Sequence, residues 1–417
     1  MRLQVDALIF GGGTAGLWLL DLLRQQGYHV LLLEAATLGS GQTIAAQGII
    51  HGGLKYTLQG LLTPSAVSIR EMPLVWRKSL QGEAAPNLSR TRIRSQCCYL
   101  WRTESLKSKL GMIGARIGLR IAPKELKQAD RPAPLAQCPG TVSRLDEQVI
   151  ATDSFLSNLA ENNASSLLAI NAENGLAFQS DKTGNITSVT LTEPNDERSL
   201  TIIPTQVIFT AGAGNAKLLQ QLGRSTPAMQ RRPLHMVMFR GSNLPPLNGH
   251  CVDGTKTRVT ITSDIDLKGR TIWQVGGQIS EEGVQWDSTQ LLQRAKEEIM
   301  AVLPEIDLTN VEGSTYRVDR AERQMSHGKR PENIQVTEEA NLITAWPTKM
   351  ALAPILANDI FARIKPPQEK TGWNKEEFAF INNWKKPTVA KLPWETCDNW
   401  QLLDEDENQQ QDVKKAS

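Results

Sequence analysis

Val5-Asp-Ala-Leu-Ile-Phe-Gly-Gly-Gly-Thr-Ala-Gly16 opens the stretch that decides the fold, and His29-Val-Leu-Leu-Leu-Glu34 closes it. Each apolar run predicts a buried strand, and residues 17–26 between them carry leucines at helical spacing. Gly27 then ends the helix, because glycine is favoured just beyond a helix C-terminus. The stretch therefore predicts a βαβ unit, in which a helix crosses over between two parallel strands.

The glycines of this unit have the spacing of a dinucleotide-binding turn. Gly11 allows a tight turn, Gly13 lets a pyrophosphate approach the backbone, and Gly16 lets the helix pack closely on the strand. The helix N-terminus offers free N–H groups to the phosphates. Glu34, at the end of the second strand, can accept hydrogen bonds from ribose hydroxyls, and its charge disfavours the 2′-phosphate of NADP. The alternative is a glycine-rich turn without a ligand.

The segment after Glu34 favours a flavin over a nicotinamide cofactor. Residues 35–56 form a long loop of mostly small side chains. A simple NAD-binding unit does not need such a loop. An extended FAD molecule does, because the chain must follow the cofactor closely from the ribose to the isoalloxazine ring. The sequence therefore predicts FAD.

These motifs resemble the FAD-dependent oxidoreductases of the D-amino acid oxidase superfamily. Within it, Val30-Leu-Leu-Leu-Glu-Ala35 and Ile50-His-Gly-Gly-Leu-Lys-Tyr56 are most similar to bacterial membrane-associated glycerol-3-phosphate dehydrogenase, with lysine in place of the usual arginine. Residues 207–214 and 341–354 also resemble superfamily segments against the flavin dinucleotide. Residues 273–283 instead resemble amine and amino-acid oxidases, so the two halves point to different substrates.

The resemblance implies an α/β fold with a Rossmann-like FAD-binding domain and a mostly antiparallel α+β substrate domain. We expect the FAD-binding domain to be discontinuous, over residues 1–90, 145–225 and 330–365. The substrate domain would comprise residues 91–144 and 226–329. Residues 366–417 would form a C-terminal extension with packed tryptophans and a disordered tail.

The resemblance also implies two sets of site residues. The candidates for binding FAD are Gly11, Gly13, Thr14, Ala15, Gly16, Glu34, Ala35, Thr43, Gly48, Ile49, Ala211, Gly212, Lys349 and Met350. We expect FAD to be bound without a covalent link, and Lys349 to lie near the flavin, where a cation would stabilise the anionic reduced ring.

The candidates for catalysis are His51, Lys55, Tyr56, Arg317 and Arg320. His51 would lie beside the flavin as a base, as a group that stabilises reduced flavin, or as a covalent attachment point; packing on the ring is the structural alternative. Lys55 and Tyr56 would line the substrate cavity. Arg317 and Arg320 would clamp a substrate carboxylate, because a guanidinium matches a carboxylate bidentately; a solvated basic face is the alternative.

Composition limits the other functions. Lys+Arg is 46 against Asp+Glu 44, which gives no electrostatic case for binding nucleic acid, and a peripheral membrane contact has no basic amphipathic helix to support it. No apolar run reaches membrane-spanning length, and five cysteines without a CxxC pair favour a cytoplasmic location. Because the five histidines are spread singly along the chain, we expect no metal site.

The sequence thus predicts a flavoprotein dehydrogenase or oxidase. It would oxidise a C–H bond next to OH or NH in a small anionic substrate: a 2-hydroxy acid, an amino acid or amine, or a polyol phosphate. The hydride would pass to the flavin, and oxygen, a quinone or another acceptor would reoxidise it. The alternatives are an NAD-dependent dehydrogenase and a non-catalytic, flavin-containing assembly protein whose C-terminus binds a partner.

Overall fold

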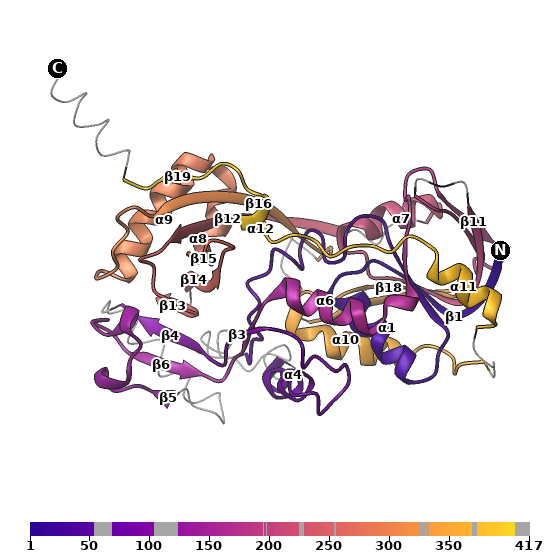
Figure 1. Ribbon diagram of the computed structural model, residues 1–417, viewed down its shortest axis with the longest axis horizontal. Helices are drawn as coiled ribbons and strands as arrows, with labels where there is room; N and C mark the ends of the chain where they lie inside the picture. The colour runs from indigo at the N-terminus through magenta and orange to yellow at the C-terminus, as the bar shows by residue number, and fades with distance from the viewer. Residues whose placement is uncertain are drawn as a thin grey trace, which may run out of the picture.

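The computed structural model describes residues 1–53, 69–103, 124–194, 196, 198–224, 229–253, 256–325, 331, 333–368 and 373–404. Over these residues the chain forms an eight-stranded and a nine-stranded sheet, which lie beside each other along the long axis of the molecule (Figure 1). No helix in this part of the chain is long and apolar enough to cross a membrane.

The eight-stranded sheet has a parallel centre, in the order β18-β11-β1-β2-β8. β17 pairs antiparallel with β18, and the β9–β10 hairpin pairs antiparallel with β11. The long apolar run of β1 is buried because strands and helices cover it on all sides. The strands are β1 (Arg2–Phe10), β2 (Val30–Glu34), β8 (Leu167–Ala169), β9 (Leu176–Ser180), β10 (Ile186–Thr192), β11 (Ser199–Phe209), β17 (Gln335–Glu339) and β18 (Leu342–Trp346).

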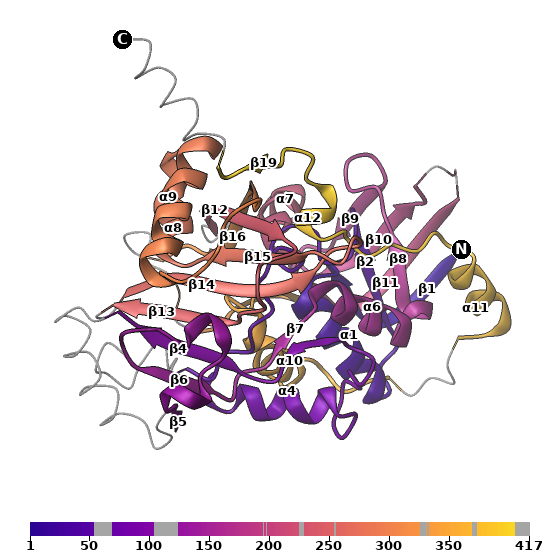
Figure 2. The same cartoon turned by 60° about the vertical axis from the view of Figure 1, so that its left-hand side comes forward.

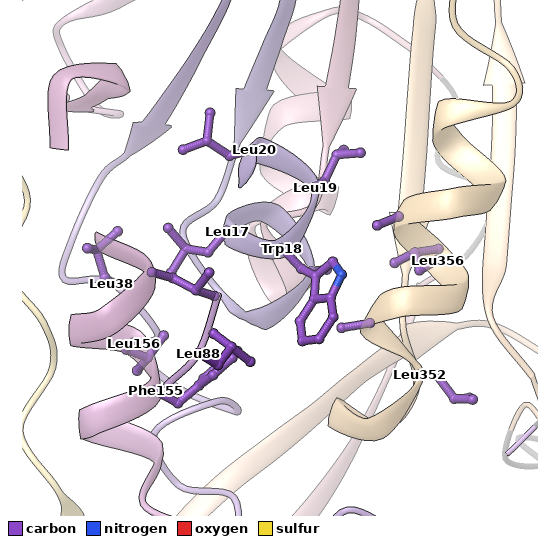
Figure 3. Packing of buried hydrophobic residues seen from close by; sticks show 14 of the residues in the cluster. Leu17, Trp18, Leu19, Leu20, Leu38, Leu88, Phe155, Leu156, Leu352 and Leu356 are labelled. Carbon is purple, nitrogen blue, oxygen red and sulfur yellow. The ribbon is translucent and has the colours of Figure 1, made fainter. Parts of the chain in front are cut away.

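Helix α1 (Thr14–Gln25) is apolar over most of its surface because it is packed on several sides. Figure 3 shows it between α6 (Thr152–Asn162) and α10 (Ala353–Phe361), with the indole of Trp18 directed toward α10. The Trp18 ring lies 4.6 Å from that of Trp76 in α4 (Met72–Leu80). The remaining elements near this sheet are α7 (Asn215–Gln221) and the 3-10 helices η3 (Ala164–Ser166), η4 (Gly212–Gly214) and η7 (Met350–Leu352).

The nine-stranded sheet has the order β19-β16-β12-β15-β14-β13-β4-β6-β5, and only its β13–β4 pair is parallel within the described residues. Apolar and polar side chains alternate along its strands, so that one face of the sheet is buried against α9, as is common in antiparallel sheets. The strands are β4 (Cys98–Arg102), β5 (Lys124–Glu125), β6 (Val142–Leu145), β12 (Met229–Gly241), β13 (Gly249–Asp253), β14 (Lys256–Ile265), β15 (Thr271–Gly276), β16 (Glu312–Arg323) and β19 (Gln401–Leu402). The helices are α8 (Gln278–Glu282), α9 (Ser288–Val302), η1 (Gln128–Asp130), η2 (Ala133–Leu135) and η5 (Gly283–Gln285).

These two sheets confirm the predicted α/β class, with a parallel-centred sheet and a mostly antiparallel one. The predicted domain boundaries themselves stay a prediction. Strands β12 and β16 pair from Met229 with Arg323 to Arg240 with Glu312 and run from the second sheet toward the first (Figures 1 and 2). A two-stranded pair, β3 (Ile93–Ser95) with β7 (Val149–Ile150), adds a separate short ladder.

Residues 373–404, which we call the C-terminal strap, cross from one sheet to the other (Figure 2). The strap begins with α11 (Lys375–Asn382), and the buried indole of Trp384 donates to Ala169 O at the edge of the first sheet. Residues 388–390 then exchange backbone hydrogen bonds with Leu38. After α12 (Pro393–Thr396), β19 pairs with β16. The predicted disordered tail beyond Asp404 lies outside the described residues.

Candidate active site

The glycine turn after β1 depends on missing side chains. Gly11 has a φ of 101°, and a Cβ there would lie 2.4 Å from Ala211 Cα. A Cβ on Gly16 would lie 2.0 Å from Gly11 O, so α1 could not pack where it does. Gly13 differs, because its Cβ would meet only Thr43 Oγ1, at 3.2 Å. Gly11 and Gly16 therefore serve the fold, whereas Gly13 leaves the surface in front of α1 bare.

The Glu34 carboxylate points back into this turn. Its Oε2 accepts a hydrogen bond from Gly12 N at 2.7 Å and its Oε1 accepts one from Ala36 N at 2.8 Å. Burial raises the pKa of Glu34, and these backbone donors oppose the rise. A carboxylate is thus fixed at the end of β2, beside the N-terminus of α1.

A cavity of about 550 Å³ lies in front of the glycine turn, and β16 closes its far side. This volume is within the usual range for small-molecule sites. Most of the predicted cofactor-binding residues line it: Gly11, Gly13, Thr14, Ala15, Glu34, Ala35, Thr43, Ala211, Gly212 and Met350. The structure therefore brings together residues that are up to 339 positions apart in the chain.

Several lining residues were not predicted from the sequence. Gln42 lies in the small-residue loop, and its Oε1 accepts from Ala321 N of β16 at 3.1 Å. Asp319 of β16 and Trp346 at the end of β18 also line the cavity. The small-residue loop was a usable signal for Gln42. The β16 residues had none, because their approach depends on the pairing of the two sheets.

Four predicted cofactor-binding residues lie beside this cavity rather than in its lining. Gly16 packs under the turn, as described above. Gly48, with a φ of 74°, and Ile49 are held against β7, where Ile150 N donates to Gly48 O and Ile49 bridges Val149. Lys349 is buried next to the lining residue Met350. Their roles in binding stay predictions.

The two predicted clamp arginines are held by the segment that follows β15. The guanidinium of Arg317 donates to Val284 O at 3.0 Å and to Trp286 O at 2.9 Å, at the edge of the cavity. The guanidinium of Arg320 donates to Glu281 Oε1 at 3.1 Å. A role in clamping substrate stays a prediction for both, and either would first have to exchange these partners. Lys55 and Tyr56 lie outside the described residues.

His51 lies in a cluster that the sequence did not predict. Its Nδ1 is 3.5 Å from Glu147 Oε2, and its ring centroid is 5.4 Å from that of His250 in β13. The Glu147 side chain is only 6% exposed, and His250 is also buried. One ring nitrogen from each histidine and one carboxylate oxygen of Glu147, the atoms that could coordinate a metal ion, all lie within 4.8 Å of one another. Separation along the chain was therefore a poor guide to space, although the expectation of no metal ion stays a prediction.

A second set of hydrogen bonds joins residues 35–53, which we call the FAD-side loop, to the second sheet. Tyr316 on β16 is partly buried, and its hydroxyl donates to Ala45 O at 3.1 Å and accepts from Gln274 Nε2 at 3.0 Å. Burial raises the pKa of Tyr316 far above its usual value, so it stays a neutral donor. Gln47 Nε2 donates to the carbonyls of Thr260 and Gln274, both at 2.9 Å. The loop is thereby fixed from both sides.

Comparison with known proteins decides the family. The model of the family described as DAO, FAD dependent oxidoreductase, matches residues 6–336. The chain belongs to this family. It is 38% identical over 399 residues to a probable FAD-dependent oxidoreductase of Pseudomonas aeruginosa, covering 95% of this chain and 98% of that protein. The crystal structure of the Pseudomonas protein aligns with a TM-score of 0.78 at 35% identity, again over 95% and 98% of the two chains.

More distant members of the DAO fold complete the comparison. Glycine oxidase from Geobacillus kaustophilus aligns with a TM-score of 0.60 at 16% identity, over 90% of this chain and 98% of its own. Glycerol-3-phosphate dehydrogenase from Bacillus halodurans aligns with a TM-score of 0.54 at 14% identity, over 87% and 64%. The predicted family, enzyme class and FAD cofactor are confirmed, and glycerol-3-phosphate dehydrogenase is a distant structural neighbour.

The cavity residues fit an FAD molecule. The N-terminus of α1 faces the cavity, because Thr14 and Ala15 line it, and a helix N-terminus favours phosphates. Thr14 N already donates to Thr43 Oγ1 at 3.3 Å, within this lining. Glu34 lines the same cavity, and its contact with the ribose stays a prediction. In the part of the chain that the structure describes, the buried Trp346 Nε1 has no hydrogen-bond partner, and Trp346 also lines the cavity. That nitrogen is closed off from the cavity, so the fit to FAD rests on the bare surface at Gly13.

Proposed function

We propose that this enzyme oxidises a C–H bond next to an OH or NH group of a small anionic substrate, with transfer of a hydride to FAD. The substrate is a 2-hydroxy acid, an amino acid or amine, or a polyol phosphate. When bound, FAD supplies the hydride-accepting chemistry, and the chain supplies alignment and charge. Oxygen, a quinone or another acceptor then takes up the electrons.

The observation that carries this proposal is the path of the FAD-side loop. This loop lines the FAD cavity as far as Ala46 and reaches His51 five residues later. His51 lies where the two sheets meet, a place that we call the junction. There it meets a buried carboxylate and a second imidazole. Oxidation of an alcohol or amine releases a proton as well as a hydride, so a proton-accepting group beside the expected position of the flavin supports the proposed reaction.

Cationic residues in or beside the cavity support an anionic substrate. Arg317 lies at the cavity edge, and Arg320 and Lys349 are candidates on neighbouring segments. Proteins of this fold include a glycine oxidase and a glycerol-3-phosphate dehydrogenase. Amine and alcohol substrates therefore both belong in the proposal. All five cysteines are free thiols, which supports a reducing, cytoplasmic location.

An anaerobic screen tests the proposal. The holoenzyme is mixed with amino acids, amines, 2-hydroxy acids and polyol phosphates, and bleaching of the visible flavin band is followed. We expect one class to bleach FAD, and His51→Asn to slow that bleaching about 100-fold, because positioned acid–base groups contribute that much. If dithionite bleaches the FAD while no compound of any class does, the proposed reaction is wrong.

A further inference from the structure

The cluster at the junction is assembled from three distant segments. His51 lies in the FAD-side loop, Glu147 lies between β6 and β7, and His250 lies on β13 of the second sheet. No short stretch of sequence holds more than one of them. The cluster therefore exists only when the two sheets are correctly joined.

Glu147 is hydrogen-bonded to the backbone of the turn that carries His51. Its Oε1 accepts from Gly52 N at 2.6 Å, and its Oε2 lies 3.5 Å from His51 Nδ1. A Cβ on Gly52 would lie 3.1 Å from Pro73 Cγ and 3.4 Å from Glu147 Oε1, so a side chain would crowd this approach. The glycine that follows His51 thus has a physical reason: it lets the backbone N–H reach the carboxylate.

The carboxylate is buried, which makes its partners matter. Removing a carboxylate from water is costly unless hydrogen bonds and an opposite charge compensate. The neighbouring Cys98 thiol is fully buried, and its pKa is raised by that burial first and by the charge of Glu147 second. The Glu147 carboxylate therefore lies in surroundings of low polarity, where each hydrogen-bond partner has a strong effect.

His250 completes the charge balance. Its Nδ1 is 2.8 Å from Thr260 Oγ1, which fixes the ring, and the ring planes of His250 and His51 are inclined by 30°. One proton on either imidazole makes a neutral set with the carboxylate. A second proton would place two cations with ring centroids 5.4 Å apart and is disfavoured. The three groups together are suited to hold one proton.

We propose that Glu147 is a positioning residue for His51, and that Glu147, His51 and His250 share the single proton released on substrate oxidation. This inference rests on the proposed function. The substrate C–H bond breaks with its electron pair passing to FAD, while the O–H or N–H proton passes to His51. A C=O or C=N bond forms in the product. Glu147 keeps Nδ1 toward itself, so the proton exchanges at Nε2.

Nitrogen-15 NMR of the histidine rings tests the cluster without any substrate. The chain has five imidazoles, which His→Asn variants can assign. We expect Glu147→Gln to abolish the protonated-ring signals of His51 in the holoenzyme. The matched control is Asp146→Asn, which removes the same charge from a side chain that is 81% exposed, and it should leave those signals unchanged. Unchanged His51 signals in Glu147→Gln would overturn the proposal.

A second variant covers the case in which Glu147→Gln does not fold. His250→Asn should also alter the His51 ring signals, and identical signals would overturn the shared proton. Elemental analysis of the purified holoenzyme is a further test. Equimolar zinc that is lost in His250→Asn would identify the cluster as a metal site and overturn the shared proton. If the NMR results hold but no substrate bleaches FAD, the proposed function fails while the cluster stands.

Discussion

The two ends that we propose for the cofactor site are built differently. At the adenosine end, Glu34 accepts from Gly12, 22 residues away within one βαβ unit, and most contacts involve backbone groups. At the junction end, Glu147 accepts from Gly52, 95 residues away, and side chains from both sheets meet. The Glu34 contact can therefore form within its own βαβ unit, whereas the Glu147 contact depends on how the sheets are held together.

Substitution of the turn glycines should have the largest effect on this comparison. Gly16→Ala should destabilise the chain by about 3 kcal/mol and release FAD, because the new methyl group would overlap Gly11 O. Gly13→Ala should leave the apoprotein as stable as wild type and weaken FAD binding alone, since only Thr43 Oγ1 is near. Thermal unfolding of apoprotein and FAD titration measure the two effects. Equal destabilisation by both variants would contradict the division between fold and binding.

The second largest effect should come from removing Trp384, the buried side chain that joins the C-terminal strap to the first sheet. Trp384→Ala removes a side chain that is 1% exposed and the hydrogen bond to Ala169 O, so we expect a loss of about 3 kcal/mol in the free energy of unfolding. FAD should also bind more weakly, because backbone hydrogen bonds join the strap to Leu38 of the FAD-side loop. Phe378→Ala on α11 is the control, since that ring is 48% exposed. Equal denaturant midpoints for the two variants would show that the strap does not stabilise this end.

The smallest expected effect concerns Lys386 of the strap. Burial lowers the pKa of its amine to about 8. Between pH 8 and the usual lysine range the unfolded chain binds the extra proton, so this residue makes stability rise with pH there, and its penalty is complete below pH 8. Lys386→Met should therefore stabilise the chain at pH 7, by about 1 kcal/mol because the amine is partly exposed.

Denaturant unfolding at pH 7 and at pH 10 checks the sign. The advantage of Lys386→Met should shrink at the higher pH, where the wild-type amine is neutral in the folded chain. Lys385→Met is the matched control, because this neighbouring side chain is exposed. A wild-type chain more stable than Lys386→Met at pH 7 would contradict the account.

The sequence predicted the adenosine end well because its signals are local. The apolar runs, the glycine spacing and Glu34 all lie within 30 residues, and each has a direct physical reason. Ala211, Gly212 and Met350 were found through the family resemblance instead. They line the same cavity because β11 lies beside β1 in the sheet and β18 lies beside β11.

The junction end could not be predicted in the same way. Nothing in the residues around Glu147 or His250 indicates that either meets His51, because the contact depends on the pairing of β3 with β7 and of β13 with β4. The strap was also missed as a connection between the sheets. Its helices are short, and its two-residue strand has too little pattern to be recognised.

The absorption spectrum of the purified protein, recorded before and after acid precipitation, tests the central claim most directly. The account predicts a visible flavin spectrum and equimolar FAD released into the supernatant, with both lost in Gly16→Ala. A colourless wild-type chain that takes up no added FAD would contradict it.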